Sequence, residues 1–343
     1  MRDRFPLVAL LLATLLVGLF FVSLLSGSVR LSPQQVAQAL LSSSGTTLAD
    51  NLLWNLRLPR TLLAMLVGLH FAAAGLILQA VIRNPLADPG VIGISSGASL
   101  AVVTVLLLAD LITIGLMQGS EPPRMLIWLP LAALIGGLGS AALVLGLSWR
   151  TRMSPAHLAL NGVAVGAVLH ALVMWVVVAW GGARTEIALI WLAGSLYGRD
   201  FVHLQVLLPW SVLGLVASLA LLRPLSLLRF DDALVRGLGL HVLRWRLIAI
   251  AVAVILAASA TAVAGPIGFI GLVVPHLARL LVGADVGRLL IVSLLAGALL
   301  TLAADIVART LISPLELPVG ALTTLIGIPV FLLLLLRRPG MQS

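Results

Sequence analysis

The sequence predicts an integral membrane protein built entirely of helices, and three observations support this fold class. Hydrophobic residues make up 61% of the 343 residues and charged residues only 10%, whereas soluble domains carry about a quarter charged residues. Mean hydropathy is +1.18. The apolar residues gather in runs of about 20, the length that a helix needs to cross a bilayer. We therefore expect one transmembrane domain over residues 1–343.

We expect ten transmembrane helices in this domain. The first run follows Arg2 and Arg4 as a signal peptide would, but it is longer than a signal core and no convincing cleavage site follows it, so we interpret it as a retained span. The stretch "AGPIGFIG" (264–271) predicts a tight turn between two spans. Gly327 and Pro329 predict a half-helix that enters before the last span. The predicted spans are residues 5–25, 61–82, 91–109, 125–149, 158–183, 201–222, 245–264, 271–283, 287–308 and 326–337.

The distribution of arginine predicts the orientation of the chain. An even number of spans places both termini on one side of the membrane. With that side in the cytoplasm, most of the 21 basic residues fall in inside segments, as the positive-inside bias requires. The net charge of +9 does not indicate nucleic-acid binding, because the arginines flank apolar runs and form no interleaved basic patch.

Two segments are too short or too charged to span. Residues 187–198, "IALIWLAGSLYG", have the length of an interfacial or re-entrant helix. Residues 229–246 are charged at both ends, and within them Asp231 and Asp232 can cap a short helix that Gly237 can end. We expect a short amphipathic helix on the cytoplasmic face, either with a specific contact or as a solvated loop helix.

Turn-forming residues stand out between the second and third spans. Seven consecutive residues, Asn84–Gly90, carry turn chemistry, and we expect them at a membrane face or lining a cavity. "GVIGI" (90–94) after Pro89 is similar to "GFIGL" (268–272), which follows Pro266. The two copies fall on opposite sides of the predicted membrane, as two halves related by an inverted repeat would show, although five matching residues can also arise by chance.

Missing residue types exclude several kinds of chemistry. The chain has no cysteine, so disulfides, thiolate metal sites and cysteine nucleophiles are excluded. All 21 basic residues are arginine, and a phosphate-binding P-loop needs lysine. Any work driven by ATP must therefore come from a partner. No His-Glu-x-x-His motif or paired-carboxylate arrangement indicates an enzyme.

Polar residues inside predicted spans are candidates for function. The histidines suggest a metal or haem relay, but a histidine bonded to a neighbouring helix is the commoner case. Asp305 is the one acid in the predicted spans and lies near an end, which disfavours an ion-coupled secondary transporter. The candidates are His70, Gln79, Asn161, His170, His276 and Asp305.

Five motifs occur in an order that resembles a known family. They are "LRLPRTLLAMLVG" (56–68), "NPLADPGVIGISSGA" (84–98), "GPIGFIGLVVPHLAR" (265–279), "ADIVAR" (304–309) and "LELPVGALTTLIGIPVF" (315–331). Together they resemble the permease subunits of bacterial ABC importers for iron–siderophore complexes, haem and cobalamin, over nearly the whole chain.

The resemblance implies an assembly in the bacterial inner membrane, with both termini of the permease in the cytoplasm. A second permease, either a copy or a paralogue, completes a homodimer or heterodimer. Two cytoplasmic ATPase subunits carry ATP and magnesium, and a periplasmic binding protein delivers the substrate. The chain itself is expected to bind no cofactor and no metal and to contact membrane lipid. It is expected to be a transport subunit and not an enzyme.

The resemblance also implies roles for individual residues. Arg57, Arg60 and Arg309 match arginines that dock the binding protein, for which membrane snorkelling and a local Arg309–Asp305 pair are alternatives. The other assignments are the inner gate, at Asn84, Pro85 and Leu86; a second gate, at Ser154, Pro155 and Ala156, where the chain departs from relatives with small hydroxyl residues; the path, at Asn161 and His170; and the ATPase contact, at Asp231, Asp232, Arg236, Gly237, Leu238 and Gly239.

The substrate is predicted from one further stretch. "WLAGSLYGRDF" (191–201) is similar to the form found in ferric-siderophore permeases. Relatives move a bulky complex along a smooth path lined by the fifth and tenth helices, and the small residues of the fifth predicted span suit that role. We expect a ferric siderophore, with haem or cobalamin as the alternative.

Overall fold

The computed structural model describes residues 4–27, 29, 31–42, 47–116, 128–151, 153–180, 185–313 and 315–336. Within these ranges the chain is helical and contains no strand, which confirms the all-helical fold. The start of the predicted fourth span (125–127), the end of the fifth (181–183) and residue 337 lie outside the described residues.

Eight helical stretches among the described residues are long and apolar enough to cross a membrane, and two further apolar helices are shorter. The count of ten spans therefore stays a prediction. The long stretches contain α1 (Phe5–Leu25), α4 (Leu58–Ile82), α5 (Ile94–Leu116), α6 (Leu129–Ser148), α7 (Pro155–Trp180), α9 (Phe201–Ala220), α12 (Val242–Ala264) and α14 (Val286–Thr310), and the two shorter helices are α13 (Ile270–Val282) and α15 (Val319–Leu336).

Short helices connect these elements. One group, α2 (Pro33–Ser42), α3 (Leu48–Asn51) and the π-helix η1 (Leu52–Arg57), precedes α4, and η1 joins α3 to α4 without a break. The 3-10 helix η2 (Pro89–Ile92) precedes α5, the 3-10 helix η4 (Trp149–Thr151) follows α6, and α8 (Thr185–Leu192), α10 (Leu222–Leu228) and α11 (Asp232–Gly237) lie between the longer helices.

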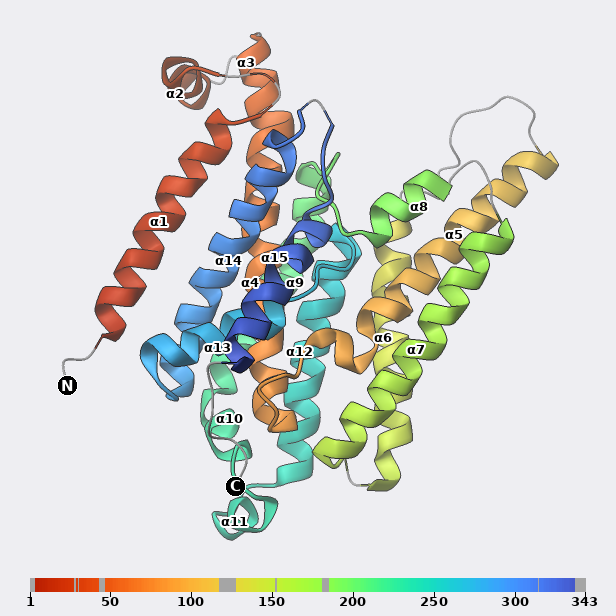
Figure 1. Ribbon diagram of the computed structural model, residues 1–343, viewed down its shortest axis with the longest axis vertical. Coiled ribbons are helices and arrows are strands. Elements are labelled where there is room, and N and C mark those ends of the chain that lie inside the picture. Colours follow the sequence, from red (N-terminus) through yellow and green to blue (C-terminus); the bar gives the residue numbers. More distant parts are fainter. Residues whose placement is uncertain are drawn as a thin grey trace.

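The helices form a bundle around α4 and α12 (Figure 1). On one side α5, α6 and α7 pack together, and on the other side α14 packs against α1, α4 and α13. Helix α12 contacts both groups, since it packs on α4, α6 and α9. Helices α3 and α11 lie at opposite ends of the molecule (Figure 1).

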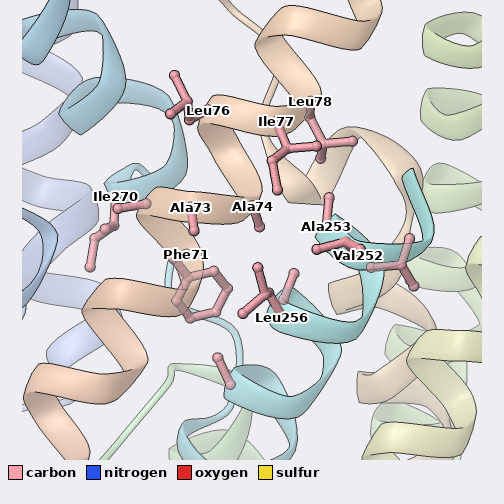
Figure 2. Packing of buried hydrophobic residues seen from close by; sticks show 14 of the residues in the cluster. Phe71, Ala73, Ala74, Leu76, Ile77, Leu78, Val252, Ala253, Leu256 and Ile270 are labelled. Carbon is pink, nitrogen blue, oxygen red and sulfur yellow. The ribbon is translucent and has the colours of Figure 1, made fainter. Parts of the chain in front are cut away.

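The core is densest around α4. Phe71 of α4 is 2% exposed, and Leu256 of α12 and Ile270 of α13 are fully buried beside it (Figure 2). Glycines allow the closest approaches: a Cβ on Gly75 would lie 1.9 Å from the carbonyl oxygen of Gly271 in α13, and one on Gly68 would lie 2.2 Å from that of Gly297 in α14. Without strong hydrophobic attraction between helices in lipid, such contacts between small residues drive helix association.

Helix α4 begins earlier than the sequence predicts. We expect a span that starts at residue 61, whereas the helical stretch runs from Leu48 to Ile82. Arg57 is the last residue of η1, and Arg60 lies in the first turn of α4. The reason is that charged residues end a hydropathy pattern but do not end a helix when other elements bind their side chains.

The last helix also differs from its prediction. We expect an interruption at Gly327 and Pro329, but α15 runs through both residues. A Cβ on Gly327 would lie 2.6 Å from Cβ of Phe269, so this glycine permits a close contact with the turn before α13. Pro329 removes one backbone hydrogen bond, which transmembrane helices tolerate. The half-helix prediction is therefore wrong.

The predicted interfacial segment, residues 187–198, is helical only as far as Leu192 in α8. Gly194 has φ +72° and would place a Cβ 2.2 Å from the carbonyl oxygen of Pro266. Ser195 N donates to the carbonyl oxygen of Ala264 at 2.8 Å, and Gly320 N donates to that of Gly194 at 2.9 Å. The segment therefore ends its helix in order to pack between the α12–α13 turn and the start of α15.

Candidate functional site

The turn segment Asn84–Gly90 lies at the end of the bundle that carries α11. It follows Arg83, which ends α4 in the left-handed conformation at φ 55°. The side chain of Asn84 accepts a hydrogen bond from Leu86 N at 2.9 Å, and Asp88 accepts one from Gly90 N at 2.8 Å. Both are local side-chain turns of the kind that stiffen a loop.

This turn segment packs against the body of the protein. A Cβ on Gly271 would lie 2.7 Å from Cδ of Pro89, so the two similar stretches, residues 90–94 and 268–272, lie close together. Burial raises the pKa of Asp88 to about 6, against the opposing effect of the hydrogen bond from Gly90. The loop therefore carries a carboxyl group that loses its charge in mildly acidic solution.

The second predicted gate lies between η4 and α7. Met153 is 1% exposed and has φ 55°, and Ser154 follows it at the start of α7. Pro155 is the first residue of α7, where proline is favoured, and the exposed Ala156 comes next. The hydroxyl of Ser154 lies 2.7 Å from Nδ1 of His157.

The two predicted gates lie on elements that touch. Helix η2, which continues the first turn segment, packs on α7, and Gly93 after η2 faces Gly166 of α7. Within α7, Asn161 donates to the hydroxyl of Ser148 at 2.9 Å, whereas His170 is exposed. The structure therefore brings Asn84–Leu86 and Ser154–Ala156 to one end of the bundle, with Asn161 in a contact between helices.

Helix α11 has the caps that its sequence predicts. The side chain of Asp231 accepts from Ala233 N at 2.9 Å. Gly237 is the last helical residue, and Gly239 has φ 81°. Leu234 is 54% exposed and Leu238 is 61% exposed. This end of the helix presents apolar side chains, with the exposed Arg236 beside them, as a surface for a partner would.

Asp232 points the other way, into the bundle. Its Oδ1 accepts from Nη2 of Arg83 and from Nη2 of Arg246, the latter at 2.8 Å. Arg83 also donates from Nε to the carbonyl oxygen of Leu228 at 3.0 Å, and Arg246 donates from Nη1 to that of Met153 at 3.2 Å. We call Arg83, Asp232 and Arg246 the Asp232 hub. The prediction gave Asp232 an ATPase contact, but its carboxylate is occupied within the chain.

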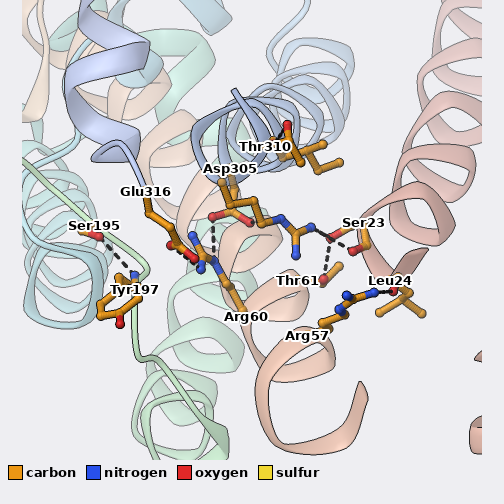
Figure 3. A network of polar contacts seen from close by, with 12 residues as sticks. Ser23, Leu24, Arg57, Arg60, Thr61, Ser195, Tyr197, Asp305, Thr310 and Glu316 are labelled. Carbon is orange, nitrogen blue, oxygen red and sulfur yellow. Dashed lines mark hydrogen bonds and ion pairs between the residues drawn. The ribbon is translucent and has the colours of Figure 1, made fainter. Parts of the chain in front are cut away.

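The opposite end of the bundle holds the three predicted docking arginines, and all three are buried. Arg57, Arg60 and Arg309 are 6%, 8% and 5% exposed. Arg57 donates to the carbonyl oxygen of Leu24 at 2.6 Å (Figure 3), and also to those of Leu25 and Val29. The sequence places these arginines at an open rim, whereas the structure uses each of them to hold chain segments together.

Arg60 and Arg309 converge on one carboxylate. Nε of Arg60 donates to Oδ1 of Asp305 at 2.9 Å, and Nη1 donates to Oε2 of Glu316 at 2.7 Å (Figure 3). Nε of Arg309 lies 3.6 Å from Oδ2 of Asp305, which is the local pair anticipated as an alternative. Nη2 of Arg309 donates to the hydroxyl of Ser23 at 2.6 Å. The cluster thus joins α1, α4, α14 and the segment before α15.

These arginines nonetheless line a common cavity. A pocket of about 280 Å³ is bordered by Arg57, Arg60, Arg199, Arg309, Glu316 and Tyr197, among others. The three groups that bind Arg57 are neutral carbonyl groups, so they do not balance its positive charge. The cavity is therefore cationic in part and could receive a carboxylate from another molecule.

His70, a fully buried histidine of α4, is a structural residue. It is fully buried, its Nδ1 lies 3.1 Å from both the carbonyl oxygen of Leu256 and the hydroxyl of Ser259, and its Nε2 lies 2.8 Å from the hydroxyl of Ser211. Gln79 likewise donates to the carbonyl oxygen of Leu272 at 3.1 Å. Among the described residues no three His, Asp or Glu side chains come together as a metal site would need.

One acid was missed by the predicted span boundaries. Asp110 lies inside α5, beyond the predicted end of the third span at residue 109, and is 4% exposed. Asp305 is thus not the one acid in the membrane-spanning helices. Glu316, Arg83 and Arg246 were also missed as functional candidates, because no local pattern shows that the folded chain pairs them with Arg60 and with Asp232.

A model of the FecCD transport family matches residues 15–337 of this chain. The chain belongs to the FecCD transport family. This assignment explains the geometry, since a FecCD chain is the membrane-embedded transport subunit of its complex and not an enzyme. The buried ion pairs therefore belong to a transport subunit and do not form a catalytic centre.

Curated relatives of this FecCD chain cover nearly its whole length. It is 41% identical to the Fe(3+)-citrate import system permease protein YfmE of Bacillus subtilis over 97% of this chain and 96% of the relative. It is 42% identical to the Fe(3+) dicitrate transport system permease protein FecD of Escherichia coli over 82% and 84%. It is 38% identical to the hemin transport system permease protein HmuU of Yersinia pestis over 97% of each chain.

A solved structure shares the fold. An inward-facing metal-chelate type ABC transporter superposes with a TM-score of 0.84 and 30% sequence identity, over 97% of this chain and all of the other. The multi-pass helical architecture of the FecCD chain is thus that of an ABC transporter permease.

Proposed function

We propose that the chain is the permease subunit of an ATP-binding-cassette importer that carries a ferric siderophore complex into the cytoplasm. The observation that carries the proposal is the similarity, over almost the full length, to permeases named for ferric citrate and for iron–hydroxamate import. Ferric citrate is the first substrate to test, because two of these relatives are named for it.

The partners follow from the same proposal. A second permease completes the path, two cytoplasmic ATPase subunits bind ATP and magnesium, and a periplasmic binding protein delivers the chelate. The absence of lysine from the chain supports this division of work, because a P-loop cannot be built without it. The end that carries α11 faces the cytoplasm together with both termini, and the end that carries the arginine cavity faces the binding protein.

Haem is the second candidate substrate, and one observation favours it. The chain is 38% identical to a hemin permease over 97% of both chains. The exposed His170 does not decide between the substrates. Selectivity resides in the binding protein, so the ligand of the cognate binding protein distinguishes a ferric siderophore from haem by its absorbance spectrum.

Reconstitution tests the function itself. The complete complex in proteoliposomes, supplied with binding protein and radioactive ferric citrate, is expected to accumulate iron only with ATP and to stop with vanadate. The complex without its ATPase subunits is the control and should accumulate nothing against a gradient. Uptake that a protonophore abolishes and vanadate leaves unchanged would show an ion-coupled transporter instead.

A further inference from the structure

Helix α11 is tied to the bundle by an ion pair as well as by apolar packing. Val235 is its buried apolar residue, and Asp232 is its inward carboxylate. The helix is only six residues long, too short to be stable alone in water. Its position therefore depends on what Asp232 and Val235 contact.

The contacts of Asp232 lead to both predicted gates. Arg83 is the residue directly before the turn segment Asn84–Gly90, and Arg246 binds the carbonyl oxygen of Met153, directly before Ser154. One carboxylate of α11 thus holds, through two guanidinium groups, the chain at the entrance of each gate segment. Within the part of the chain that the structure describes, no second carboxylate pairs with Arg83 or Arg246.

The two attachment points share an unusual backbone conformation. Arg83 and Met153 both have φ 55°, a left-handed conformation that costs a residue other than glycine roughly 1–2 kcal/mol. Such strain persists only where the surroundings impose it. The side chain of Arg83 and the carbonyl group of Met153 are both held by the hub, so the strain and the hub coincide at each gate.

Water cannot readily take the place of the Asp232 carboxylate as the partner of Arg246. It is 1% exposed, and a buried guanidinium requires an anionic partner. Hydrogen bonds from Arg246 and Arg83 lower the pKa of Asp232, although burial alone would raise it. Its carboxylate is therefore charged throughout the neutral range.

We propose that Asp232 is a positioning residue for transport, which passes the movement of α11 to both gate segments through Arg83 and Arg246. The inference rests on the proposed function, in which ATPase subunits move α11. Their closure displaces α11 as a rigid body, and Asp232 then draws the ends of α4 and of the η4–α7 turn with it. Without the carboxylate, α11 still meets the ATPase, but the gates no longer follow.

The test compares Asp232→Asn with wild type in the complete reconstituted complex. Asparagine keeps the shape and can still begin a helix, but it removes the charge that two arginines share. We expect the complex to assemble and to hydrolyse ATP, while the iron taken up per ATP hydrolysed falls at least about tenfold, the order of coupling between linked sites. Asp232→Glu, which retains the carboxylate, should recover part of the lost uptake.

Asp285→Asn is the matched control. Asp285 is an exposed carboxylate that caps α14 by accepting from Arg288 N at 2.9 Å, and asparagine caps as well as aspartate. This variant should transport as wild type does. A general loss of charge at this end of the bundle would affect both variants, whereas loss of the hub affects only Asp232→Asn.

A spin label reports the gate directly. The chain has no cysteine, so Leu86→Cys gives a single labelled site per permease in the turn segment. In a labelled complex that still transports, nucleotide should change the spectrum with Asp232 present and leave it unchanged with Asp232→Asn. If Asp232 had only a structural role, Asp232→Asn would shift the spectrum recorded without nucleotide and the spectrum recorded with nucleotide by the same amount. The change caused by nucleotide would then remain.

The outcomes separate the two proposals. If the wild-type complex shows no ATP-dependent uptake, the proposed function fails. If the wild type transports and Asp232→Asn retains its uptake per ATP and its spectral response, the inference is wrong while the function stands. If Asp232→Asn no longer assembles with the ATPase subunits, Asp232 belongs to the docking surface, and the inference is again wrong.

Discussion

Arg60 shows how a charged residue is accommodated at the end of a membrane-spanning helix. Its guanidinium bridges Asp305, which is fully buried, and Glu316. The three residues come from α4, α14 and the segment before α15 (Figure 3), so their ion pairs fix the relative positions of these segments.

Removal of Arg60 should therefore destabilise the protein strongly. Arg60→Met leaves Asp305 with Arg309 at 3.6 Å as its remaining ion-pair partner, and breaking one side of a buried pair costs about 3–5 kcal/mol. The double variant Arg60→Met, Asp305→Leu should lose further stability, because it also leaves the buried Arg309 without its carboxylate partner. Thermal unfolding of the purified permease measures both. Equal destabilisation by the single and double variants would contradict a buried pair of Arg309 with Asp305.

The sequence identified Arg60 but not its role. The motif "LRLPR" contains Arg60. The two arginines of this motif lie just before a predicted span, at a membrane face, and this position suggests a contact with another protein. The partners Asp305 and Glu316 are 245 and 256 residues away, and only the folded chain brings them together. Local patterns identify charged residues well, whereas the burial of those residues depends on tertiary neighbours.

At the scale of the elements, two glycine contacts set the position of α4. Gly68 meets α14 and Gly75 meets α13, each at a distance that excludes a side chain. Because α4 also packs on α12 and α9, it is surrounded along most of its length. The apolar faces of α7 are exposed instead, for example at Val163 and Trp175.

Gly75→Ala should separate α4 from α13. The new Cβ would lie 1.9 Å from the backbone oxygen of Gly271, which cannot rotate away, and overpacking of this kind costs about 1–3 kcal/mol or more. Gly139→Ala in α6 is the control, since a Cβ there meets nothing within 4 Å and alanine favours a helix. Thermal unfolding should show a lower midpoint for the first variant only. Equal midpoints would show that α4 and α13 separate without cost.

Helices were easier to predict than their ends. Long apolar runs predicted the membrane-spanning stretches, because crossing a bilayer requires length and hydrophobicity that the sequence displays directly. The early start of α4 and the continuous α15 were not predicted. In the first case arginines end the hydropathy pattern but not the helix, because their side chains are bound by distant segments. In the second case Gly327 lies in close contact with Phe269, and the helix continues through Pro329.

At the scale of the whole molecule, the chain resembles a conduit with separate machinery at its two ends. The Asp232 hub and the predicted gate segments lie at the end that carries α11, and the arginine cavity lies at the end where η1 meets α4. Figure 1 shows α11 and α3, which precedes η1, at opposite ends of the bundle. Under the proposed function, the first end contacts the ATPase subunits and the second contacts the binding protein.

Docking at the arginine cavity should depend on salt. The cavity contains Arg57, whose carbonyl partners leave its charge in place, and charge pairs at a partly open site weaken as the Debye length falls to about 8 Å at physiological ionic strength. The affinity of the binding protein for proteoliposomes should fall as salt is added, and Arg57→Gln should reduce that dependence. An affinity that stays the same as salt is added would contradict electrostatic docking of the binding protein at this face.

A single rod connects the two sides of the membrane. Helix α4 has 25 residues, or about 38 Å at 1.5 Å per residue, with Arg60 in its first turn and Arg83 directly after its last. Because the helix is continuous, a tilt at one end displaces the other, and this links the ion pairs of Arg60 mechanically to Arg83 in the Asp232 hub.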